Sequence, residues 1–188
     1  MIRRLLGVAL PALAVMATVS ACAEPGLPAP GSAANAAAAQ AELCLTGDVT
    51  ATVAAEPAEG AEQSALVTVT NTGTGSCAVD GWLSITLVNA ANRPVTVPTV
   101  RLDRPTAATE IPLAPGESAY AGIRWATCTR GEQGCGIGNI LRYDLALSTT
   151  GPAAALEGFP KTKKRNSISM RSLEIGTLQP DSAGATDW

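Results

Sequence analysis

Histidine is absent from all 188 residues of the chain. Its absence excludes Ser-His-Asp and Cys-His catalysis, imidazole general bases, and zinc or copper sites with histidine ligands. Hydrolysis by a Ser-Lys pair or by paired carboxylates would not need histidine, but the predicted strands contain no Ser-x-x-Lys and the acidic residues are scattered through turns. We therefore predict no catalytic residues, no cofactor and no metal site.

Aromatic residues and methionines are scarce. The chain has one Phe, two Tyr and three Trp, which leaves few rings for stacking on saccharides. Trp82 and Trp125 lie in alternating segments, where filling the core is the expected role. Of the three methionines, Met1 and Met16 belong to an N-terminal apolar run, so only Met170 remains for a folded domain and we expect it in the core.

A second apolar run of membrane-spanning length is also missing. The first run covers Leu5 to Thr18, fourteen residues behind Arg3 and Arg4. A spanning helix needs roughly 20 residues, whereas the apolar part of a secretory signal runs about 7 to 15. The run therefore predicts export.

The end of this leader reads Val19-Ser20-Ala21-Cys22, which is similar to a bacterial lipobox. In a lipobox the cysteine receives a diacylglyceryl group and the chain is cut in front of it. We predict a signal peptide over residues 1–21 and a lipid anchor on Cys22, which holds the protein on the outer face of the cell membrane. The alternative is an ordinary cleavage site, which would leave Cys22 as a free thiol.

Loss of the leader would leave 11 basic and 16 acidic side chains, a net charge of −5. That balance argues against a nucleic-acid partner, because phosphates require a basic face. Residues 22–42 are rich in Ala, Pro and Gly and are predicted to form a tether with a reach of about 25 Å. We expect one domain over residues 43–178 and a frayed C-terminal tail over residues 179–188.

From Leu43 onward the pattern changes to short segments with a period of two, separated by Gly, Pro, Asn and Asp. About eight strands are predicted, at residues 48–55, 65–71, 82–88, 94–102, 109–113, 119–127, 140–148 and 167–175. Frequent β-branched residues and regularly spaced turns favour an all-β fold, an antiparallel β-sandwich, over helical layers.

Three motifs resemble the actinobacterial family of secreted proteins and lipoproteins known as domain of unknown function 4232. They are Cys44 ahead of the first strand, the segment VTNTGTGSCAVDGW over residues 69–82, and LAPGESAYAGIRW over residues 113–125. In the second motif, Leu83 stands where that family commonly has Pro. The resemblance covers roughly Leu43 to Gly176, and it implies an immunoglobulin-like β-sandwich outside the cell with no established activity or site.

Four cysteines follow Cys22, and an exported chain is expected to pair them as disulfides. Three connectivities are open. We predict Cys44–Cys77, because it would join the start of the domain to the turn after its second strand, and Cys128–Cys135, which would close the segment CTRGEQGC. The family pattern agrees. A redox role for the second pair is disfavoured, because six residues separate the two cysteines instead of two.

Two further segments have the composition of binding motifs. GCGIGN, over residues 134–139, is superficially like a phosphate loop, but Asn139 replaces the third Gly and no helix follows, so entry to a strand is expected. KTKKR, over residues 161–165, could touch anionic headgroups or acidic wall polymers, although a solvated loop is the preferred interpretation. Asp103 and Arg104 are likewise expected at the solvated surface.

These observations predict an extracytoplasmic lipoprotein whose β-sandwich binds an envelope protein or a cell-wall component without catalysis. Two alternatives stay open. The protein could carry a lipid or another small solute, or it could be a histidine-independent hydrolase of the envelope.

Overall fold

The computed structural model describes residues 41–57, 60–163 and 165–188. Cys22, the signal peptide and nearly all of the tether lie outside these residues. The described part of the chain is all-β: it forms fourteen strands and one short 3-10 helix, η1 (Thr46–Asp48). It contains no helix that is both long and apolar enough to cross a membrane.

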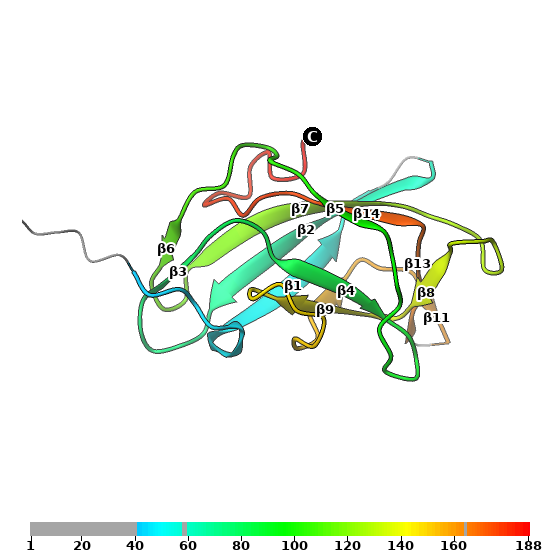
Figure 1. Ribbon diagram of the computed structural model, residues 1–188, viewed down its shortest axis with the longest axis horizontal. Helices are drawn as coiled ribbons and strands as arrows, with labels where there is room; N and C mark the ends of the chain where they lie inside the picture. Colours follow the sequence, from blue (N-terminus) through cyan, green and yellow to red (C-terminus); the bar gives the residue numbers. More distant parts are fainter. Residues whose placement is uncertain (1–40, 58–59, 164) are drawn as a thin grey trace, which may run out of the picture. The chain divides into compact units, whose positions relative to one another are not determined.

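Six strands form the largest sheet, in the order β10-β1-β2-β7-β14-β5 (Figure 1). Antiparallel pairing joins β1 to β2, β2 to β7 and β7 to β14, whereas the outer strands β10 and β5 pair in parallel. The strands are β1 (Val49–Ala55), β2 (Glu62–Asn71), β5 (Thr99–Arg101), β7 (Ser118–Ala126), β10 (Ala155–Glu157) and β14 (Ser172–Ile175).

The other eight strands form four antiparallel pairs. These are β3 (Cys77–Val79) with β6 (Ile111–Leu113), β4 (Ser84–Val88) with β9 (Ile140–Asp144), β8 (Gly136–Gly138) with β13 (Ile168–Met170), and β11 (Lys161–Thr162) with β12 (Arg165–Asn166).

The core lies between the large sheet and the β4–β9 pair. Alternate side chains of β1, β2 and β7 point toward this pair and are fully buried, as Val53, Val67 and Ile123 are. Leu87 and Leu141 from β4 and β9 belong to the same buried cluster. The pair therefore covers one face of the large sheet, and the interior is filled mainly by aliphatic side chains.

The two ends of these strands carry different parts of the chain. At one end, Cys44 and the turn at 72–76 lie next to Asp144, which accepts a hydrogen bond from Thr46. At the other end, β7 leads to Cys128 and β4 leads to the 89–93 loop, with β8 and β11 nearby (Figure 1). We name these the Cys44 end and the Arg130 end. A nine-residue strand such as β7 separates them by about 27 Å.

Most expected strands form, but the details differ. The segment predicted as one strand at 167–175 divides at Arg171 into β13 and β14, which belong to different sheets. Strands β3, β8 and β10 were not predicted. KTKKR was expected to be a loop and instead forms the β11–β12 hairpin, with Lys163 at its turn in the left-handed region (φ 50°).

The expectation of a frayed tail at 179–188 was wrong. Ala185 is fully buried, and the Trp188 indole nitrogen donates to the Ala185 carbonyl at 2.8 Å. Trp188 covers the outer face of the large sheet at Gly122 and Gly176. A Cβ at Gly122 would lie 2.2 Å from the Ala185 carbonyl oxygen, and a Cβ at Gly176 would lie 3.0 Å from the Trp188 ring. The segment fits because both positions lack a side chain.

Candidate functional site

Both predicted disulfides are confirmed. Cys44–Cys77 has its sulfur atoms 2.02 Å apart, and Cys128–Cys135 has them 2.09 Å apart. Beside the first bridge, the Cys44 nitrogen donates to the Ala78 carbonyl and the Ala78 nitrogen donates to the Glu42 carbonyl, both at 2.8 Å. The first bridge therefore fixes the start of the domain at the Cys44 end, next to the point where the predicted tether would join it.

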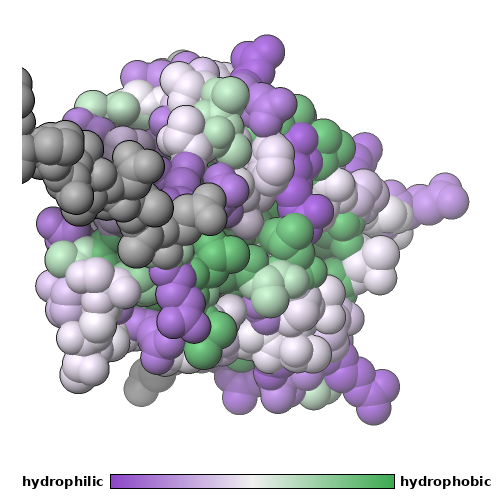
Figure 2. Space-filling model, turned by 60° about the vertical axis from the view of Figure 1, so that its left-hand side comes forward, coloured by the Kyte–Doolittle hydropathy of each residue, from purple (hydrophilic) through white to green (hydrophobic). Residues whose placement is uncertain are grey.

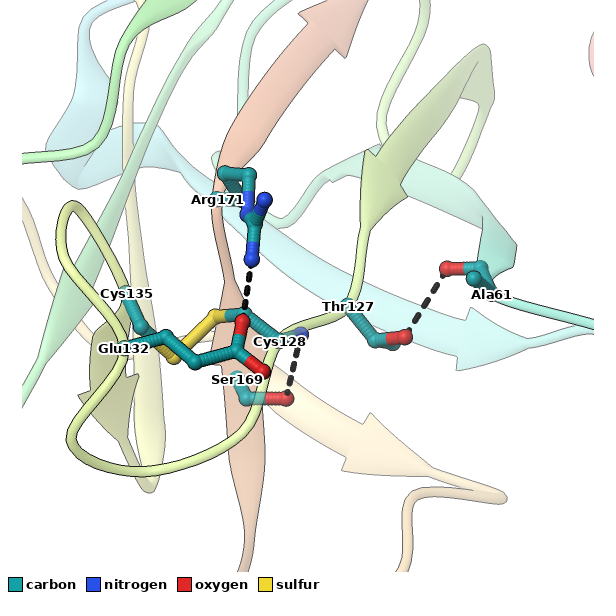
Figure 3. A network of polar contacts seen from close by, with 7 residues as sticks. All are labelled: Ala61, Thr127, Cys128, Glu132, Cys135, Ser169 and Arg171. Carbon is teal, nitrogen blue, oxygen red and sulfur yellow. Dashed lines mark hydrogen bonds and ion pairs between the residues drawn. A yellow bond between two sulfur atoms is a disulfide. The ribbon is translucent and has the colours of Figure 1, made fainter.

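The second bridge closes a loop at the Arg130 end, and polar contacts hold that loop on β13 and β14 (Figure 3). Glu132 in the loop forms an ion pair with Arg171, and the Cys128 nitrogen donates to the Ser169 hydroxyl at 3.4 Å. Hydrogen bonds from Thr129, with a further contribution from Arg171, hold the pKa of Glu132 below its usual value. The carboxylate is therefore charged at neutral pH and can pair with Arg171.

Arg130 is carried by this loop and faces a hollow of about 380 Å³, which we name the arginine pocket. Its lining consists of residues 89–91, Arg130, residues 137–139, Thr162 and residues 165–167. Four separate segments thus meet here: the β4 loop, the disulfide-closed loop, β8 and the KTKKR hairpin. The volume lies within the range of about 300 to 1,000 Å³ that small-ligand sites occupy.

Two buried polar atoms in this pocket lack a partner. The amide oxygens of Asn139 and Asn166 are shielded from solvent and accept no hydrogen bond from the part of the chain that the structure describes. Both residues line the arginine pocket. Buried side-chain oxygens are normally paired, and leaving one unpaired is costly. Each amide would have to turn toward the pocket before a ligand hydroxyl could donate to its oxygen.

The β4 loop forms a firm wall of the pocket. The Asn89 side chain accepts hydrogen bonds from the backbone nitrogens of Ala91 at 2.9 Å and Arg93 at 3.1 Å. Asn92, at a φ of 60°, accepts a hydrogen bond from Arg142 at 3.0 Å. These bonds set the loop conformation before any ligand arrives, which lowers the cost of binding.

Glycines shape the opposite wall. A Cβ at Gly138 would meet the Leu87 side chain at 2.5 Å, and one at Gly136 would meet Val95 and Val97 at 3.0 Å. GCGIGN was expected only as the entry to a strand, whereas it contains strand β8 itself, and its glycines allow close packing of β8 against neighbouring segments.

Electrostatically, the arginine pocket differs from hollows at the Cys44 end. Its lining includes Arg130 and Arg165 and no acidic residue. A hollow at the Cys44 end is lined by Glu42 and Asp48 and by no basic residue. The lining of the arginine pocket is therefore positive in a chain whose net charge is −3.

The Cys44 end also has an apolar hollow of about 350 Å³, lined by residues 43–46, 78–80, 145 and 146. Hydrophobic surface lies among polar side chains in the view that turns this side of the domain forward (Figure 2). Leu43 and Leu45 are 59% and 68% exposed there. Nearby, Asp144 accepts hydrogen bonds from Thr46 and Ser148, so this carboxylate holds the local fold together.

The expectation that Trp82 and Trp125 fill the core is confirmed for Trp125 only. Trp125 is buried and stacks on Phe159 with ring centroids 5.8 Å apart, and Met170 is fully buried. Trp82 lies just before β4, is only half-buried, and donates to the Leu102 carbonyl at 2.9 Å, whereas its neighbour Leu83 fills the core. Asp103 and Arg104 are exposed, as expected.

The sequence analysis does not connect Arg130 with Asn139, Arg165 or Asn166. Their shared location depends on pairing between β8 and β13 and on the hairpin, which local patterns do not predict. No group of three Cys, Asp or Glu side chains arranged to hold a metal ion occurs within residues 41–57, 60–163 and 165–188.

A family model described as "Domain of unknown function (DUF4232)" matches residues 44–182, about three quarters of the chain. No curated protein and no solved structure matches it.

Proposed function

The chain belongs to the family described as domain of unknown function DUF4232, and on that premise we propose that it is a lipid-anchored binding module on the outer face of a cell membrane. In this proposal the module is not an enzyme, its strands form an immunoglobulin-like sandwich, and its ligand is a component of the cell envelope. An actinobacterial origin, which the sequence resemblance implies, is part of the same proposal.

Anchoring is supported by the order of segments along the sequence. A charged and apolar leader precedes the lipobox-like VSAC, and a tether of small residues follows Cys22. The domain then contains two disulfides, which persist in oxidising compartments outside the cytoplasm. These features are those expected of an exported lipoprotein.

One observation carries the binding function: the arginine pocket opens at the end of the strands opposite to the start of the domain. Residue 41, the first that the structure describes, precedes Glu42, whose carbonyl accepts a hydrogen bond from Ala78 at the Cys44 end. The Arg130 end is therefore about 27 Å from the point of attachment, where it can meet ligands in the envelope. Its two arginines and two unpartnered amide oxygens are the features of a recognition site.

A second candidate, a lipid carrier, is favoured by the apolar hollow at the Cys44 end. A carrier that encloses an acyl chain needs an interior cavity. The interior between the large sheet and the β4–β9 pair is filled by side chains such as Val67, Ile123 and Leu141, which are fully buried. This filling supports the binding module over the carrier, and native mass spectrometry of the purified lipoprotein tests the carrier directly by detecting any co-purified lipid.

Anchoring is tested on the chain produced in a native host. We expect mass spectrometry to show a diacylglyceryl group on Cys22 and no residues 1–21, and we expect Cys22→Ser to move the protein from the membrane to the soluble fraction. An unmodified Cys22 in the membrane-associated protein would contradict the lipid anchor.

Binding is tested by sedimentation of the detergent-solubilised lipoprotein with purified, insoluble cell-wall material. We expect the native protein to co-sediment and the reduced, urea-unfolded and diluted protein to remain in the supernatant. Equal recovery of both in the supernatant would contradict cell-wall material as the ligand of the module.

A further inference from the structure

We propose that the arginine pocket binds an anionic carbohydrate polymer, that is, a chain of sugar or polyol units with free hydroxyl groups and regularly placed carboxylates or phosphates. The assignment rests on the proposed function, because it names the ligand class of the envelope-binding module. Four segments of the domain build the site, and each supplies a specific part of the recognition.

The two guanidinium groups favour an anionic ligand. Arg130 and Arg165 are exposed, they line one pocket, and the pocket lining has no carboxylate to neutralise them. Arginine is well suited to carboxylate and phosphate because its planar group donates two parallel hydrogen bonds. The neighbouring cations Lys161 and Lys163 on the hairpin are also exposed and add to the positive potential.

The two amide oxygens require donors, which an anion alone does not have. Asn139 and Asn166 each have a shielded amide oxygen without a donor within the described ranges. The terminal torsion of an asparagine side chain is broad, so each amide can turn toward a donor at small cost. Hydroxyl groups are both donors and acceptors, and a hydroxylated anion therefore satisfies the arginines and the asparagines together.

The shape of the site favours a polymer over a compact ion. At about 380 Å³ the pocket is far larger than one phosphate or sulfate requires, and it opens to solvent between the hairpin and the β4 loop. Its lining contains no aromatic side chain. Recognition by hydrogen bonds and charge, without ring stacking, is what these residues provide.

The walls are held in place before binding. Arg130 is carried by a loop that the Cys128–Cys135 bridge closes and that the Arg171–Glu132 ion pair attaches to the segment between β13 and β14 (Figure 3). The β4 loop is fixed by Asn89. Positioning of this kind reduces the entropy that a ligand must remove.

Titration calorimetry of the full-length lipoprotein in detergent tests the proposal with four defined compounds. Oligogalacturonate carries hydroxyls and carboxylates, polyglycerol phosphate carries hydroxyls and phosphates, inorganic polyphosphate carries charge without hydroxyls, and dextran carries hydroxyls without charge. We expect one of the first two to bind at least tenfold more tightly than the last two. Which of them does so distinguishes a uronate polymer from a phosphate polymer. Polyphosphate or dextran binding as tightly as both would overturn the proposal, as would the absence of binding by all four.

Variants assign the binding to the pocket. Replacing Arg130 and Arg165 by Gln is expected to weaken binding of the preferred polymer at least tenfold, because hydrogen bonds to charged groups are lost. The charge-matched control replaces the exposed Arg101 and Arg104, which lie outside the pocket, by Gln, and we expect it to change affinity less than twofold at 150 mM salt. Equal losses in both variants would mean that only net charge matters.

A second variant separates binding from folding. Asn139→Leu removes a shielded, unpartnered amide, so its thermal unfolding temperature should be unchanged or higher while its affinity falls. A variant that loses affinity only in proportion to lost folded protein would contradict a role for this side chain in binding.

Different results would contradict the envelope-binding module and the arginine pocket. If the wild type sediments with cell wall and the Arg130 and Arg165 variant sediments equally well, the arginine pocket is wrong and the binding module stands. If the wild type binds none of the wall material yet binds oligogalacturonate or polyglycerol phosphate, the pocket stands and the envelope ligand is wrong.

Discussion

The side-chain nitrogen of Asn71 lies 2.9 Å from the carbonyl oxygen of Leu113 and donates a hydrogen bond to it. The same amide group donates to Gly75 and accepts from the Gly73 nitrogen, each at 2.9 Å. Asn71 is fully buried at the end of β2, and Leu113 ends β6. One side chain therefore joins the Asn-Thr-Gly turn to the strand that precedes the Ala-Pro-Gly turn, so the two family-like motifs meet in space.

We expect Asn71→Ala to lower the free energy of unfolding by about 2 kcal/mol, because it removes three hydrogen bonds and one of them, to the Leu113 carbonyl, is buried. The matched control is Thr72→Ala, which removes an exposed hydroxyl bonded to the Asp48 carbonyl and should cost less than about 1 kcal/mol. Urea unfolding of both variants measures the difference. Equal costs would contradict the organising role of Asn71.

The two disulfides should contribute unequally to stability. In the loop-entropy model the 33-residue separation of Cys44–Cys77 corresponds to about 3.8 kcal/mol, and the 7-residue separation of Cys128–Cys135 to about 2.5 kcal/mol. Replacing each pair by Ser and measuring urea unfolding should rank them in that order. The opposite ranking would indicate that contacts of the shorter loop, and not chain entropy, dominate.

The sequence was sufficient to predict the strands whose side chains alternate. Val67 and Val69 in β2, and Ala121 and Ile123 in β7, all point into the core, and their period of two is visible in the sequence. Strand β10 was missed because it pairs in parallel with β1, across about a hundred residues, at Thr52↔Ala155, and a three-residue strand in a Gly- and Pro-rich segment has no periodic signal.

Only those parts of the candidate site that lie in one short segment of the sequence could be predicted. Cysteine spacing predicted both bridges, and the basic hairpin was recognised as a cationic segment. The arginine pocket could not be predicted, because Asn139 and Asn166 become neighbours through the pairing of β8 with β13 and through the fold of the β11–β12 hairpin. An unpartnered amide oxygen is a property of three-dimensional packing and leaves no pattern in the sequence.

Asp144 should make the stability of the Cys44 end depend on pH. Its pKa is lowered, chiefly by the hydrogen bond from the Ser148 hydroxyl and further by those from the Ala146 nitrogen and Thr46. Because the folded state holds the carboxylate charged, its contribution is complete above about pH 5 and is lost as the pH falls below the usual value of 3.8.

We therefore expect the free energy of unfolding of the wild type to fall more steeply between pH 5 and pH 2 than that of Asp144→Asn. Urea unfolding at several pH values measures the two slopes. The control Asp181→Asn removes an exposed carboxylate and should leave the slope unchanged. Parallel curves for the wild type and Asp144→Asn would contradict the prediction.

Gly122 should be required for the packing of the C-terminal segment. A Cβ there would lie 2.2 Å from the Ala185 carbonyl oxygen and 2.9 Å from the Trp188 indole nitrogen. We expect Gly122→Ala to displace residues 185–188, to shift tryptophan fluorescence to longer wavelength and to speed proteolysis near the C-terminus. Gly75→Ala is the control, because a Cβ there meets nothing within 4 Å. Unchanged fluorescence in Gly122→Ala would contradict the prediction, because Trp188 would then have kept its place on the sheet.

Removing the Cys128–Cys135 bridge should weaken ligand binding even though this bridge contributes less to the free energy of unfolding than Cys44–Cys77. Arg130 lies inside the eight-residue loop that this bridge closes, and the loop is otherwise attached mainly by the exposed Arg171–Glu132 pair and by a long 3.4 Å bond from Cys128 to Ser169. Exposed ion pairs contribute little, so opening the bridge frees Arg130. A free arginine loses side-chain and backbone entropy when it binds, and the affinity for the preferred polymer should fall about threefold to tenfold.

The comparison that isolates this effect uses two Ser double variants, one for each bridge, titrated at a temperature where both remain folded by circular dichroism. Cys44–Cys77 lies at the opposite end of the strands, so its removal should lower stability more and affinity less than removal of Cys128–Cys135. This reversal of order between stability and affinity is the decisive readout, because a bridge that acts only through global folding must rank the same way in both. Affinity losses that follow the stability losses would show that the shorter bridge does not position Arg130.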